Sequence, residues 1–240
     1  MLVTALLMGY LMPVKAQIIK SEDLEKYAKS KYGDKWLDAA AVIAKGVSFD
    51  KNNNLSYQQV IEAPNKTKAQ LYVTMNYWTT ATFKDKQSIT LNDKETGTII
   101  ITATMQNIAT HTGGLSQYSV SITPIIKIDI KDGKVRVTYT VQNYDILRDI
   151  SGGILGAIFD DHSGTFDDQK RKKDNITNRN LYDEVWPLTT CYPFVEKDEH
   201  MAKRTSAKAL VMTHAYSNVV LDKIEEAVKN GVVGNEDDDW

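Results

Sequence analysis

The last part of the sequence predicts one long helix, and this segment constrains the fold more than any other. Residues 198–230 contain neither proline nor glycine, and Gly231 follows where a helix would end. Apolar side chains recur along one side of this helix: Leu210, Tyr216, Val220, Ile224, Ala227 and Val228. A helix of about 30 residues is roughly 45 Å long. Its apolar side therefore needs a large partner, and a sheet formed by the preceding residues is the available one.

Five segments upstream have the pattern of strands: 55–62, 88–92, 98–108, 117–130 and 134–144. In the last of them Val135, Val137 and Tyr139 alternate with polar residues, which is typical of a sheet with one covered face. Asp132-Gly133 lies between the last two segments and predicts a tight hairpin, because both residues tolerate positive φ. Thr67 is suited to cap a helix that runs to about residue 83. The sequence therefore predicts an α+β fold with a five-stranded antiparallel sheet and both long helices packed on one of its faces.

Two short helices are predicted before the sheet. Ser21–Tyr32 has Ser21 as a candidate N-cap and Gly33 as its end, and a second helix begins near Asp34 and ends before Gly46. We interpret residues 17–46 as a helical lead-in and residues 47–240 as a single domain. A glycine-rich, then acidic, then basic stretch near residues 150–180 is expected to be a loop insertion.

The first residues indicate export. Leu2–Val14 is an apolar run too short to cross a bilayer, and Val14-Lys15-Ala16 has the small or branched residues that a signal peptidase accepts. Residues 1–16 are therefore predicted to be a signal peptide, and the mature chain to be periplasmic or secreted. The alternative is an N-terminal helix of the folded domain.

Charge and cysteine content argue against several classes of protein. The formal net charge is −2, so no broad basic field favours a nucleic-acid partner, and the one dense basic run, Lys170–Lys173, is interpreted as a solvated loop. The single cysteine, Cys191, forms neither an intramolecular disulfide nor a zinc site alone, and it is interpreted as a small buried side chain rather than a nucleophile. His200 and His214 are predicted to lie about four turns apart on the last helix, too far apart to share a metal.

Two stretches resemble metal sites without completing one. Asp50–Asn54 resembles the opening of a calcium loop, but Leu55 stands where the turn needs glycine and Ile61 where a bidentate glutamate belongs. We interpret it as a polar turn that leads into a strand. A second group surrounds one histidine and is interpreted as a solvated loop: Asp160, Asp161, His162, Asp167 and Asp168. The sequence therefore predicts no catalytic, cofactor-binding or metal-ligating residue and favours a non-enzymatic protein.

The residues that begin the predicted sheet resemble a known bacterial family. The runs Leu55–Glu62 and Lys66–Tyr72, and the hairpin Ile128–Arg136, are similar to the family called a domain of unknown function with TBP-like fold, where TBP is the TATA-box-binding protein. The resemblance covers roughly Leu55–Tyr144 and implies the element order β-α-β-β-β-β-α in an exported protein of the cell envelope. The family supplies no activity and no functional residues, and its fold does not imply DNA binding.

Three functions are consistent with these patterns. The first is a non-enzymatic domain that binds an envelope protein or a surface polymer. The contact surface would be the outer face of its sheet or the segment Ile150–Phe159. That segment is either a buried crossover or an exposed loop that meets a ligand, a membrane surface or a partner. The second is a small-molecule or lipid carrier with a cavity between the sheet and the last helix, although Trp78, Phe83, Met212 and Tyr216 would suffice to fill that space. The third is an envelope hydrolase based on Asp161 and His162.

Overall fold

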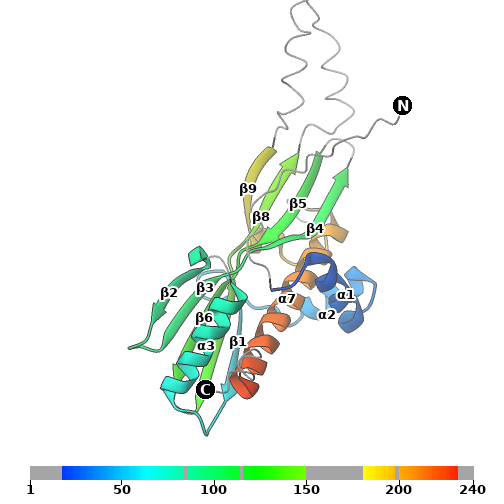
Figure 1. Cartoon of the computed structure of the whole chain (residues 1–240). Helices are drawn as coiled ribbons and strands as arrows, with labels where there is room; N and C mark the ends of the chain where they lie inside the picture. Colours follow the sequence, from blue (N-terminus) through cyan, green and yellow to red (C-terminus); the bar gives the residue numbers. More distant parts are fainter. Residues whose placement is uncertain (1–17, 84–85, 114–115, 150–180, 198–199, 232–240) are drawn as a thin grey trace, which may run out of the picture.

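The strands form two antiparallel sheets that share one layer of helices (Figure 1). The computed structural model describes residues 18–83, 86–113, 116–149, 181–197 and 200–231. The first sheet has five strands, in the spatial order β1 (Leu55–Glu62), β7 (Lys134–Val141), β6 (Ile125–Lys131), β3 (Thr98–Thr102) and β2 (Ile89–Asp93). The second has four, in the order β4 (Met105–Gly113), β5 (Ser116–Ile122), β8 (Asn143–Asp149) and β9 (Leu181–Pro187). The helices are α1 (Ser21–Tyr32), α2 (Trp36–Ala44), α3 (Lys68–Thr82), the short α6 (Leu188–Cys191) and α7 (Lys203–Asn230), with a 3-10 turn, η1 (Lys86–Ser88).

The first sheet confirms the predicted fold. Its strands and the two long helices follow the order β1-α3-β2-β3-β6-β7-α7, which is the predicted β-α-β-β-β-β-α. The hairpin between β6 and β7 also forms as predicted, with Lys131 opposite Lys134 and Gly133 at a φ of 72°. Glycine suits this turn because a side chain rarely tolerates positive φ.

The second sheet was not predicted, because three predicted strands each cross from one sheet into the other. The segment 98–108 divides into β3 and β4, 117–130 into β5 and β6, and 134–144 into β7 and the start of β8. Pro124 stands at one crossing and has no backbone N–H to donate to a ladder, while its carbonyl accepts from Ala103 N–H at 3.2 Å. Strand β9 completes the second sheet from beyond residue 180.

The helices cover one face of the two sheets. Helix α3 packs against β6 and β7, and α7 packs against β1, β7 and α3 and also against β4 of the second sheet. Figure 1 shows α7 extending from the second sheet along the first, with α1 and α2 beside it. The four side chains predicted to fill the space under the helices are all buried: Trp78, Phe83, Met212 and Tyr216. Burial of this apolar area is the main stabilising contribution to the fold.

The helix ends agree with the sequence in part. Thr67 caps α3 as predicted: its hydroxyl accepts from Gln70 N–H at 3.3 Å, and Gln70 Oε1 accepts from Thr67 N–H at 2.9 Å. The assignment of Ser21 as an N-cap was wrong, because Lys20 holds that position and the Ser21 hydroxyl donates to the carbonyl of Asn107 in β4. Among the helices that the structure describes, none combines the length and apolar character needed to cross a membrane.

Candidate functional site

The first sheet has an open face opposite its helices. Along β6, Ile126, Ile128 and Ile130 are buried against the helices, so the alternate side chains point to the other face. The same alternation along β7 buries Val135 and Val137. The side chains on the open face include four cations, which we call the cationic patch: Lys127, Lys131, Lys134 and Arg136.

Asp129 organises one side of the cationic patch. Its Oδ2 accepts from Arg136 Nη2 at 2.7 Å and from Arg136 Nε at 3.2 Å, and its Oδ1 lies 2.9 Å from Lys127 Nζ. Burial raises the pKa of Asp129, but the hydrogen bonds from Arg136 and Lys127 outweigh it and hold the pKa below its ordinary value. With both oxygens engaged by cations, this carboxylate is an ionised counter-ion rather than a general base.

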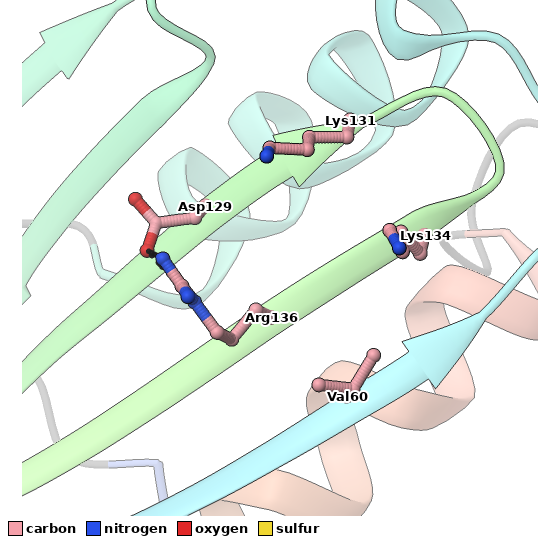
Figure 2. Close-up of a pocket in the computed structure, with 5 residues that line it drawn as sticks. All are labelled: Val60, Asp129, Lys131, Lys134 and Arg136. Atoms are coloured by element: carbon pink, nitrogen blue, oxygen red, sulfur yellow. Dashed lines mark hydrogen bonds and ion pairs between the residues drawn. The ribbon is translucent and has the colours of Figure 1, made fainter.

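Lys131 and Lys134 form the other side and lie opposite each other across the hairpin (Figure 2). Both side chains are exposed, and neither makes an ion pair with another residue in the part of the chain that the structure describes. Like charges directly opposite on neighbouring strands repel, so an anion between them would relieve that repulsion.

A shallow pocket of about 170 Å³ lies over this cluster, lined by Val60, Asp129, Lys131, Lys134 and Arg136. Val60 comes from β1, opposite Arg136 in register, and its side chain is 48% exposed. Sites for whole drug-sized ligands span roughly 300–1,000 Å³, so this pocket suits one carboxylate or phosphate group of a larger partner. Its lining offers charge and a small apolar contact for binding.

This pocket was not predicted from the sequence, because its lining combines residues of three strands. The polar side of β7, with Arg136, follows from its alternation. The contribution of β6 depends on the hairpin register, which places Lys131 beside Lys134 and Asp129 beside Arg136. The Asp132-Gly133 turn was the signal that could have paired these residues in advance.

The residues that the sequence singled out do not meet at one site. Asp50 forms the expected polar turn: its Oδ1 accepts from the N–H groups of Asn52 at 2.8 Å and Asn54 at 2.9 Å, so this oxygen is bound to the chain's own backbone. Cys191 is buried at the end of α6, which agrees with its interpretation as a small buried side chain. Three predicted features lie outside the described residues: the signal peptide, 1–16; the apolar loop, Ile150–Phe159; and the charged stretches, Asp160–Asp168 and Lys170–Lys173.

The two histidines that the sequence assigned to the last helix, His200 and His214, have separate environments. The prediction that both lie on that helix was wrong, because α7 begins at Lys203 and His200 precedes it, stacked on Trp186 with 4.8 Å between ring centroids. His214 lies within α7, 5.3 Å from the ring of Tyr57 in β1. No described residues gather three or more potential metal ligands.

Two solved structures show similarity to this chain. A crystal structure of a TBP-like protein from Parabacteroides distasonis is similar, with a TM-score of 0.47 and 12% identity, over 75% of this chain and 96% of that chain. A crystal structure of a DUF4468 family protein from Bacteroides ovatus has a TM-score of 0.33 and 19% identity, over 41% of this chain and 58% of that chain. No curated protein matches the sequence significantly.

A family match covers the part of the chain that forms the first sheet and carries the cationic patch. Both predicted hallmarks, the run from β1 into α3 and the β6–β7 hairpin, fall almost entirely within it. Residues 57–145 match the model of the domain of unknown function (DUF4468) with TBP-like fold, which confirms the resemblance predicted from the sequence.

Proposed function

We propose that this protein is a non-enzymatic binding module of the bacterial cell envelope, and that the open face of its first sheet binds an anionic partner, either a protein or a surface polymer. The observation that supports the proposal is the pair Lys131 and Lys134, exposed and side by side on a face that no described helix covers. Arg136, oriented by Asp129, and the exposed Val60 extend the contact surface. Cations beside a small apolar contact fit a carboxylate- or phosphate-bearing partner.

The buried core favours a binding module over a carrier. A carrier needs a cavity between α7 and the first sheet, and Met212 and Tyr216 of α7 and Trp78 and Phe83 from the region of α3 occupy that layer. A close-packed interior of this kind leaves the molecule's exposed faces as its binding surfaces.

Binding to defined anionic polymers tests the proposal. The probes are polyglutamate and polygalacturonate, with neutral dextran as the reference, and the measurement is the dissociation constant by calorimetry. Substitution of Lys131→Gln with Lys134→Gln should weaken binding about 2- to 30-fold, since exposed ion pairs contribute roughly 0.2–1 kcal/mol each. The matched control, Lys45→Gln with Lys51→Gln, removes two exposed lysines elsewhere and should bind as the natural chain does. Equal binding by both double variants, or no binding to either polymer, would show that the patch is not the binding surface.

Export is the second part of the proposal and has its own test. Expression of the full chain in its host should yield a mature protein outside the cytoplasm that begins at Gln17, as read by N-terminal sequencing. A protein that retains Met1–Ala16 in the cytoplasmic fraction would contradict it.

A further inference from the structure

The open face of the first sheet continues onto the second sheet. Between residues 117 and 130 every second residue is buried, without interruption, although β5 ends at Ile122 and β6 begins at Ile125. The alternate side chains therefore point to the same side in both sheets. One continuous surface joins the cationic patch to the outer face of β5 and its neighbours.

The charge reverses along this surface. A groove of about 660 Å³ crosses the second sheet, and its lining includes the carboxylates Asp145 and Asp183 and the hydroxyls of Ser119, Ser121 and Thr123, with no lysine or arginine. Asp145 and Asp183 form what we call the acidic patch. The cationic patch has four cations on β6 and β7 against the carboxylates Asp129 and Glu62, so the two ends of the surface carry opposite net charge. About ten residues of strand, or roughly 33 Å, separate them along the surface.

The two patches also have a similar arrangement of charged and apolar side chains. Val60 lies opposite Arg136 in register and is 48% exposed, and Val185 lies opposite Asp145 in register and is 60% exposed. Each patch thus sets charged side chains beside one exposed valine. Lys134 and Arg136 are two residues apart on one strand, about 7 Å, and Asp145 and Asp183 are diagonal neighbours on two strands, about 7–8 Å.

We infer that the partner of the cationic patch is the acidic patch of a second copy of this chain, in a face-to-face dimer. The inference rests on the proposed function, because it names the anionic partner of the same site. A two-fold axis that lies in the interface, across the strands and between the patches, places each cationic patch over the other copy's acidic patch. Both complementary contacts form at once and the assembly closes, as two-fold symmetry requires.

The association is expected to be weak and sensitive to salt. All the charged side chains involved are on an exposed surface, where screening acts over about 10 Å at 0.1 M ionic strength and over about 3 Å at 1 M. The two valines add a small apolar contact. The dimer should therefore form at high protein concentration and low salt.

Charge reversal provides the decisive experiment, with analytical ultracentrifugation of the full chain over about a hundredfold range of concentration at low salt. The natural chain should rise from 27.0 kDa toward twice that mass. The variant Lys131→Glu with Lys134→Glu, and the variant Asp145→Lys with Asp183→Lys, should each stay monomeric. The chain that carries all four substitutions should associate again, and so should an equimolar mixture of the two double variants.

Two further variants distinguish a loss of association from misfolding. Asp145→Asn with Asp183→Asn keeps an oxygen that accepts from the Thr123 hydroxyl, which now donates to Asp145 Oδ2 at 2.8 Å, and it should weaken association while leaving the circular dichroism unchanged. The control Lys45→Glu with Lys51→Glu should associate as the natural chain does. A natural chain that remains monomeric, or a fourfold variant that fails to associate although it is folded, would overturn the inference.

The outcomes separate the dimer from the proposed function. A monomeric chain that binds polyglutamate through Lys131 and Lys134 would overturn the dimer and leave the binding module intact. A dimer that obeys the charge reversal but is not dissociated by either polymer would support the dimer and contradict the binding of anionic partners outside the chain.

Discussion

His214 is a half-buried base in a group of aromatic side chains between α7 and the first sheet. The Tyr57 ring contacts both His214 and Tyr139, with centroids 5.3 Å and 6.0 Å away. The hydroxyls of Tyr57 and Tyr139 and the Nδ1 of His214 have no hydrogen-bond partner within the described residues. Burial raises the pKa of both tyrosines, and burial together with the charge of Lys31 lowers the pKa of His214, so the group is neutral near pH 7.

His214 should therefore make the fold less stable in mild acid. The pKa of His214 in the folded state is below its unfolded value of about 6.5. Between these two pKa values the unfolded state binds more protons than the folded state, so the free energy of unfolding falls as the pH drops below about 6.5. The slope is at most about 1.4 kcal/mol per pH unit for one proton. Urea unfolding of the natural chain and of His214→Phe at a series of pH values measures it. The variant should lose less stability than the natural chain between about pH 7 and pH 5, and parallel curves would contradict the assignment.

Gly97, in the β2–β3 turn, has the closest surroundings of the five glycines whose environment the structure describes. Its φ is 72°, and a Cβ there would lie 2.7 Å from the carbonyl oxygen of Ile130. Gly97→Ala should lower the free energy of unfolding by more than the roughly 1–2 kcal/mol that positive φ alone costs an L-residue. Gly33→Ala, with a φ of 89° and open space, should show only that cost, and Gly46→Ala should be close to neutral. Denaturant titrations of the three variants give the order, and an equal loss at Gly33 and Gly97 would exclude the steric contribution.

At the scale of elements, α3 depends on its capping box. Thr67→Ala removes the side chain that caps the helix and should cost about 1 kcal/mol of stability. The matched control is Thr74→Ala in the same helix, where the threonine hydroxyl donates to the Gln70 carbonyl and alanine is the better helix former. The control should be neutral or slightly stabilising in the same denaturant titration. If Thr67→Ala also proved neutral, the cap would not contribute to the stability of the folded chain.

Helix ends and turns that depend on residues close in sequence could be predicted from the sequence. Gly33 and Gly231 mark two helix ends, Thr67 marks a helix start, and Asp132-Gly133 marks the hairpin, because each depends on neighbours in sequence. The division into two sheets was not predictable from periodicity, since the buried alternation passes through Pro124 unchanged. The bulge in β4 was equally hidden, although Asn107 there has a φ of 56°.

The cationic patch was likewise predictable only where it depends on neighbours in sequence. Its residues on β7 were visible as the polar side of an alternating strand, but the set becomes a site only through long-range pairing. The charge reversal between the two sheets depends on β8 and β9, whose pairing joins Asp145 to Val185 across the gap from residue 149 to 181. Pairing at that separation has no local signal in one sequence.

At the scale of the molecule, α7 should make the two sheets unfold together. It packs against β1 and β7 of the first sheet and against β4 of the second. Trp78 beside the first sheet and Trp186 in the second are both buried and serve as reporters. In variants that keep only one of these tryptophans, with phenylalanine at the other tryptophan positions, the fluorescence transition in urea should coincide with the circular dichroism transition of the same variant. Separate midpoints would mean that each sheet is an independent unit.

The position of α7 after every described strand also affects biosynthesis. Domains usually begin to fold from the N-terminus while translation continues. Here the helix that completes the core of both sheets follows every described strand in the sequence, so neither sheet has its full apolar cover until α7 has left the ribosome. Until then, the apolar side chains that both sheets bury against α7 lack that cover, so the strands alone do not complete the folded core.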